Sequence, residues 1–122
     1  MRSGFFDAQV LGYDEYGNPQ FDRAESAGFL ASFISGFVRT GVSPEGGGLV
    51  VSPGEGMQVQ VNAGKCFIEG YFGWAEEPET LSIGPADSLL NRIDAVVARL
   101  DLVERTVTLA VKAGVPKAQP NP

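Results

Sequence analysis

The stretch GMQVQVNAGKCFIEGYF, residues 56–72, alternates apolar and polar side chains with a period of two. Val59 and Val61 alternate with glutamines, and Cys66 continues the apolar series after the glycine. This period is typical of β-strands that bury one face. With Gly64 between its two halves, the stretch predicts a β-hairpin and indicates a mainly β fold.

Other short strands are predicted on both sides of this hairpin. Residues 80–84, 92–102 and 105–114 contain alternating or continuous apolar runs, and the last two are joined near Glu104. The 16 glycines and eight prolines indicate many turns. Strands separated by brief turns favour antiparallel pairing, so we expect an antiparallel β-sandwich, with residues 91–101 in a central strand.

One amphipathic helix is predicted before the strands, over residues 23–39. Asp22 and Glu25 have the spacing of a capping box, and Gly41 suits the exit of the helix. The helix packs on the sandwich through one apolar stripe, made of Phe29, Leu30, Phe33, Ile34, Phe37 and Val38. The predicted fold is therefore α+β: mainly β, with an N-terminal helix.

The chain divides into three parts by composition. Residues 1–20 form an irregular arm with aromatic residues and the turn sequence YGNP. Residues 21–114 hold the helix and the β-sandwich, and the proline-rich residues 115–122 are predicted to be an extended linker. A single domain of this length is expected to bury roughly two-thirds of its unfolded surface.

The composition excludes several classes of function. The net charge of −6 argues against a sequence-independent nucleic-acid binder and against docking on an anionic membrane, and no apolar run is long enough to insert in a membrane. The chain has no histidine, which excludes a Ser–His–Asp or a Cys–His site. Cys66 is interpreted as a small buried side chain. We predict no catalytic site, no metal site and no cofactor.

Acidic residues are the remaining candidates for chemistry. The segments DEYGN (14–18) and AEEPE (75–79) lack the ordered spacing of a calcium loop and are interpreted as solvated loops. Paired carboxylates for sugar hydrolysis are a minor alternative, drawn from Glu69, Glu76, Glu77 and Glu79.

Two groups of side chains are candidates for binding or for structure. Tyr71, Phe72 and Trp74 concentrate aromatic surface near a strand end, as in a protein interface or a sugar-binding platform. The block NRIDAVVARLD interleaves charge with apolar residues. We interpret its charges as structural ion pairs, because unpaired buried charge is costly; these are Arg92, Asp94, Arg99 and Asp101.

Two segments carry a resemblance to a known family. GMQVQVNAGKCFIEGYF, followed by LNRIDAVVARLDLVERTVTLAVKAGVP, resembles a recurrent module of bacteriophage baseplate and tail-fibre proteins. The helical segment AESAGFLASFISGFVRTGV also occupies the place of the N-terminal helix in such proteins. The module is similar to the shoulder domains of phage receptor-binding proteins, which are often homotrimers.

The resemblance implies a non-enzymatic structural protein of the virion tail, made in the bacterial host cytoplasm. Its expected partners are further copies of itself and other baseplate proteins, with host glycans engaged indirectly. Candidate interface residues are the aromatic ones of the arm and helix: Phe5, Phe6, Phe29, Phe33 and Phe37. The alternative is a carbohydrate-binding module that uses Tyr71, Phe72 and Trp74.

Overall fold

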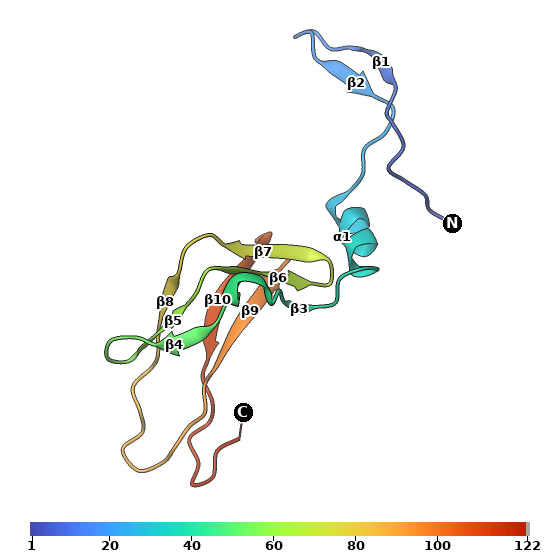
Figure 1. Ribbon diagram of the computed structural model, residues 1–122. Helices are drawn as coiled ribbons and strands as arrows, with labels where there is room; N and C mark the ends of the chain where they lie inside the picture. Colours follow the sequence, from blue (N-terminus) through green and yellow to red (C-terminus); the bar gives the residue numbers. More distant parts are fainter. Residues whose placement is uncertain (122) are drawn as a thin grey trace.

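The computed structural model describes residues 1–121 and is mostly β, with several antiparallel sheets and one α-helix (Figure 1). This confirms the predicted α+β class. Pro122, the last residue of the predicted linker, lies outside the described residues.

The N-terminal part consists of a small hairpin and the helix. β1 (Val10–Tyr13) pairs with β2 (Pro19–Phe21), and α1 spans Ala27–Ser35. The prediction of a helix over residues 23–39 is therefore too long at both ends. Ser26 is the N-cap residue and accepts a hydrogen bond from the Phe29 amide at 3.1 Å.

The predicted capping box is wrong, because its two carboxylates bind the arm. Asp22 accepts a hydrogen bond from the Gln9 amide at 2.8 Å, and Glu25 accepts one from the Phe5 amide at 3.1 Å. Both carboxylates thereby satisfy backbone amides of a distant segment, and they hold residues 5–9 of the arm beside the entry to the helix.

The remaining strands form two three-stranded sheets and one two-stranded ribbon, all antiparallel. A short 3₁₀ turn, η1 (Glu45–Gly47), separates β3 from β4. One sheet has the order β3-β6-β7, from Gly41–Val42, Gly64–Ile68 and Tyr71–Ala75. The other has the order β4-β5-β8, from Val51–Pro53, Gln58–Val61 and Glu79–Ser82. The ribbon pairs β9 (Ala95–Asp101) with β10 (Thr106–Lys112).

The hairpin predicted around Gly64 is wrong. β5 pairs with β4 and β8, whereas β6 pairs with β3 and β7, so the two neighbouring strands belong to different sheets. The hairpin of this region joins β6 to β7 through Glu69 (φ 50°) and Gly70 (φ 85°). Positive φ at both central residues is the geometry of a type I′ turn, which matches the twist of the flanking strands.

The helix meets the sheets at this same turn. Gly70 lies against the backbone of Ala31, so closely that a side chain at position 70 would overlap the Ala31 carbonyl group. Ala31 is the helical residue that is fully buried. The prediction that the whole apolar stripe of the helix packs on the strands is wrong, because the Phe33 side chain remains half exposed.

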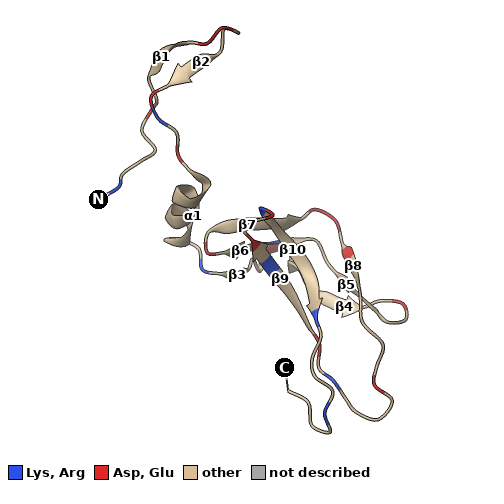
Figure 2. Cartoon of the chain, turned by 180° about the vertical axis from the view of Figure 1, so that it is seen from behind, with Lys and Arg blue, Asp and Glu red and all other residues tan. Residues whose placement is uncertain are grey.

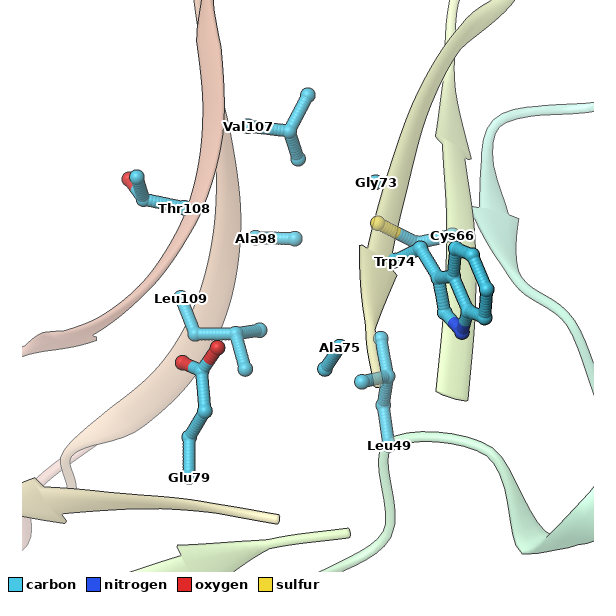
Figure 3. Close-up of a pocket in the computed structure, with 10 residues that line it drawn as sticks. All are labelled: Leu49, Cys66, Gly73, Trp74, Ala75, Glu79, Ala98, Val107, Thr108 and Leu109. Atoms are coloured by element: carbon cyan, nitrogen blue, oxygen red, sulfur yellow. The ribbon is translucent and has the colours of Figure 1, made fainter. Parts of the chain in front are cut away.

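The ribbon β9–β10 lies beside β7, with a cavity of about 250 Å³ between them (Figure 3). Val107 and Ala98 face Cys66 across this cavity, while the Trp74 indole lies on the opposite side of its strand. Cys66 is buried, as predicted. β9 pairs with β10 alone, so the expectation that residues 91–101 form a central strand is wrong.

The core is small for a chain of this size. Within residues 1–121, the buried apolar side chains are Ala31, Val61 and Cys66. The accessible surface is 9460 Å², whereas a compact monomer of 12.9 kDa exposes about 6,300 Å². The chain therefore buries only about half of its unfolded surface rather than the expected two-thirds.

Candidate functional site

The charged block NRID, residues 91–94, lies just before β9 and ties three segments of chain together. Arg92 Nε donates to Asp94 Oδ1 at 2.8 Å, which is the ion pair expected from the sequence. Asp94 Oδ1 also accepts a hydrogen bond from the Gly114 amide at 2.9 Å. Both charged side chains are only about one-sixth exposed, with 16% for Arg92 and 15% for Asp94.

The guanidinium group of Arg92 also binds the loop that follows β8. Its Nη2 donates to the Gly84 carbonyl at 2.7 Å, and its Nη1 donates to the Pro85 carbonyl at 3.0 Å. The planar fork of donors suits this use, because one side chain satisfies two backbone carbonyls and a carboxylate together.

A third contact fixes the C-terminal segment. Asn91 and Lys117 form an antiparallel bridge, in which the Lys117 amide donates to the Asn91 carbonyl at 2.8 Å. The start of the predicted linker, residues 115–117, therefore runs beside residues 91–94. We call this set of contacts the exit clamp: Asn91, Arg92 and Asp94, with Gly84, Pro85, Gly114 and Lys117.

The hydrogen bonds of the exit clamp stabilise the ionised form of Asp94. The Gly114 amide lowers the pKa of the Asp94 carboxyl most, and the hydrogen bond and charge of Arg92 lower it further. The carboxylate is therefore charged at neutral pH and orders backbone and guanidinium donors.

The other two charged residues of the block have different roles. Arg99 is exposed on β9 opposite Thr108 and makes no ion pair with any of residues 1–121. Asp101 accepts hydrogen bonds from the amides of Val103 and Glu104, at 3.0 and 2.9 Å, and so shapes the turn between β9 and β10.

Four of the five candidate interface residues gather into one aromatic cluster, defined as Phe5, Phe29, Phe33 and Phe37. The Phe5 ring lies 5.3 Å from Phe29 and 4.8 Å from Phe33, and Phe33 lies 5.2 Å from Phe37. The Arg2 guanidinium lies 4.8 Å from the centre of the Phe29 ring. Phe37 remains 78% exposed, so the cluster presents apolar surface to solvent.

Phe6, the fifth candidate, lies outside this cluster. It is 63% exposed and has no aromatic partner among residues 1–121. The helical spacing of Phe29, Phe33 and Phe37 predicted that their side chains share one stripe, but no sequence signal showed that Phe5 would join them.

The three aromatic residues of β7 do not form one platform. Successive side chains of a strand point to opposite faces, so Phe72 and Trp74 share the outer face and Tyr71 points inward. On the outer face, the Phe72 ring lies 5.4 Å from the Phe67 ring in a tilted arrangement, and the Lys65 ammonium group lies 5.3 Å from the Trp74 ring centre. Phe72 and Trp74 are about half exposed.

Two of the candidate carboxylates for hydrolysis, Glu69 and Glu76, lie at opposite ends of β7. Glu69 occupies the turn before β7, whereas Glu76, Glu77 and Glu79 follow the end of that strand. Seven residues of extended chain separate Glu69 from Glu76 by about 23 Å, well beyond the roughly 5–9.5 Å between the carboxylates of glycosidases. Within residues 1–121, no group of three or more acidic or cysteine side chains has the arrangement of a metal site.

No helix among the described residues has both the length and the apolar character needed to cross a bilayer. Comparison of the chain with protein-family models, with curated proteins and with solved structures finds no match. The candidate site therefore consists of the exit clamp and the exposed aromatic surfaces on α1 and β7.

Proposed function

We propose that this chain is a non-enzymatic structural protein of a phage tail or a phage-derived tail. In this role it acts as a baseplate or tail-fibre assembly adaptor, which anchors or presents receptor-binding elements. It is made in the bacterial host cytoplasm, incorporated into the virion tail and assembled as a homotrimer with other baseplate proteins around it.

The observation that carries this proposal is the large exposed surface. The chain exposes roughly 3,100 Å² more than a compact monomer of its mass. The exposed surface includes large apolar side chains, among them the aromatic cluster at α1 and Phe72 and Trp74 on β7. Surfaces of this kind are covered by other subunits in assembled proteins.

The exit clamp supports the adaptor role. A protein that presents another element needs a fixed direction for its connecting segment, and Lys117 is bonded to the main body through Asn91. The approach of the ribbon β9–β10 to β6 and β7 supports the finer prediction that the strands pack as a β-sandwich in the assembled state.

The test is the mass of the chain in solution, alone and mixed with the tail proteins encoded beside it. We expect a homo-oligomer that forms a larger complex of fixed stoichiometry with one of these proteins. Phe37→Ser should weaken the assembly at least tenfold, because it removes an exposed ring of the aromatic cluster.

A matched control for this variant is Leu89→Ser, at a residue that is 90% exposed in the loop after β8. It should leave the assembly unchanged. The proposal fails if the chain is a monomer at all concentrations and binds no neighbouring tail protein.

The second candidate function, direct glycan binding, is favoured by the outer face of β7. Trp74 borders a hollow of about 380 Å³ whose polar lining residues include Ser43, Glu45 and Lys65. An exposed indole beside hydrogen-bonding groups suits a sugar ring. Saturable binding in a saccharide titration, abolished by Trp74→Ala but retained in Leu89→Ser, would support this candidate, whereas no binding to any host saccharide would reject it.

A further inference from the structure

The hairpin β1–β2 stands apart from the sheets in this chain (Figure 1). Strands of four and three residues do not form a stable hairpin alone in water. Five large apolar side chains on or beside this hairpin are at least half exposed: Val10, Leu11, Tyr13, Tyr16 and Phe21. Within residues 1–121, these apolar side chains of the hairpin are left without a covering surface.

A matching surface lies between α1, β7 and the turn of the ribbon. It is an apolar groove of about 470 Å³, a size that accommodates several side chains or a small ligand. We define the apolar groove by its lining residues, which are Ala27, Tyr71, Phe72, Leu100, Asp101, Leu102, Arg105, Thr106 and Val107. Leu102 is 60% exposed at its edge.

The hairpin is acidic, and the rim of the groove offers one basic partner. Residues 10–21 hold the acidic residues Asp14 and Glu15 and no basic residue, whereas the charged residues that line the groove are Asp101 and Arg105. Figure 2 shows acidic residues at the tip of the hairpin and residues of both charges along the ribbon. Arg105, on the rim of the groove, makes no ion pair with any of residues 1–121.

The hairpin cannot simply fold back on the groove of its own chain without breaking the contacts at its base. Glu25 and Asp22 bind the backbone amides of Phe5 and Gln9, and Phe5 packs on α1. These contacts direct the hairpin away from the sheets (Figure 1). Obligate interfaces bury about 2,000–5,000 Å² over both partners, or about 1,000–2,500 Å² per chain, so the excess surface of roughly 3,100 Å² per chain is large enough to supply one.

We propose that the hairpin β1–β2 of one copy docks in the apolar groove of a second copy. Each chain carries both the hairpin and the groove, so the exchange of hairpins closes an assembly of identical subunits. The inference rests on the proposed function, because it names one contact through which copies of the adaptor associate.

The first test is disulfide trapping between two full-length variants. Leu11→Cys places a thiol on the hairpin, and Leu102→Cys places one at the edge of the groove. The native Cys66 is buried and does not compete. We expect mixed oxidised samples to give the Leu11–Leu102 cross-linked heterodimer at least tenfold above a control that pairs Leu11→Cys with Leu89→Cys. Equal yields from the two pairs would overturn the inference.

The second test uses charge reversal and self-association measured by sedimentation. Glu15→Lys on the hairpin and Arg105→Glu on the groove should each weaken self-association, by about two- to fivefold for exposed charges. A chain carrying both changes should recover the parent affinity. Two weakening effects that simply multiply in the double variant would contradict the pairing.

The outcomes separate this inference from the proposed function. A chain that assembles with tail proteins but gives neither the cross-link nor the charge rescue rejects the hairpin exchange alone. A chain that gives both signals but binds no tail protein rejects the adaptor role and retains the exchange.

Discussion

Gly73→Ala tests whether the ribbon β9–β10 lies on the sheet β3-β6-β7. A methyl group at this position would lie 2.7 Å from Val107 Cγ1 and 2.9 Å from Cys66 Sγ. Both distances are well below the optimal separation of such atoms, which is about 3.5–4.0 Å. Because Val107 is β-branched and stiff, the ribbon must move by close to 1 Å, and overpacking of this kind costs about 1–3 kcal/mol. For a chain of this length, a loss of about 2 kcal/mol lowers Tm by roughly 6–12 °C.

The measurement is thermal unfolding by circular dichroism at one fixed protein concentration, since assembly changes Tm. The matched control is Gly12→Ala in β1, where an added methyl group meets no atom within 4 Å. The double variant of Gly73→Ala with Val107→Ala should be destabilised by less than the sum of the single changes, by at least about 0.5 kcal/mol. If Gly73→Ala is as stable as Gly12→Ala, the two layers do not pack at this point and the reasoning is wrong.

The exit clamp and the helix give three further predictions. Asp94→Asn should lower Tm at neutral pH and flatten its acid dependence. The pKa of Asp94 in the folded protein lies below its ordinary value of 3.8. The stability that the ionised carboxylate contributes is therefore present at neutral pH and is lost as the pH falls from about 5 through this pKa. A Tm profile of the variant from pH 7 to 2 that matches the parent would contradict this. Arg92→Met should cost about 1–3 kcal/mol in urea unfolding, because it removes donors from two carbonyls and a carboxylate, and a cost near zero would count against the clamp. Ser26→Ala should cost about 1 kcal/mol through loss of the helix cap, whereas Ser32→Ala on the same helix should not, and equal effects would refute the capping role.

Local pattern predicted the types of element but not their partners. The alternation around Val59 and Cys66 correctly indicated strands, because a period of two depends only on which face is buried. It did not show that β5 and β6 join different sheets, since pairing depends on segments such as Val51–Pro53 and Glu79–Ser82 elsewhere in the chain. The sequence pattern did not reveal the turn at Glu69–Gly70, because a two-residue turn does not interrupt the alternation of apolar and polar side chains.

The sequence predicted the contacts of the candidate site that join two side chains, but not those that involve backbone atoms. The pairing of Arg92 with Asp94 followed from their charges and spacing, and the structure confirms it. The partners Gly84, Pro85 and Gly114 contribute backbone atoms, which every residue carries, so no sequence pattern identifies them. The start of the helix was predicted too early for the same reason. The carboxylates of Asp22 and Glu25 accept hydrogen bonds from backbone amides of the distant arm rather than from amides of the first helical turn.

The Asn91–Lys117 bridge has a mechanical consequence. The N-terminal end of β9 and the C-terminal end of β10 lie at the same end of the ribbon, so tension on the C-terminal segment would peel the two strands apart one hydrogen bond at a time. The bond between Lys117 and Asn91 and the bond between Gly114 and Asp94 lie ahead of the first strand pair, Lys112 and Ala95. They form a latch that carries the load before the ribbon does, and the force needed to open the ribbon depends on this latch.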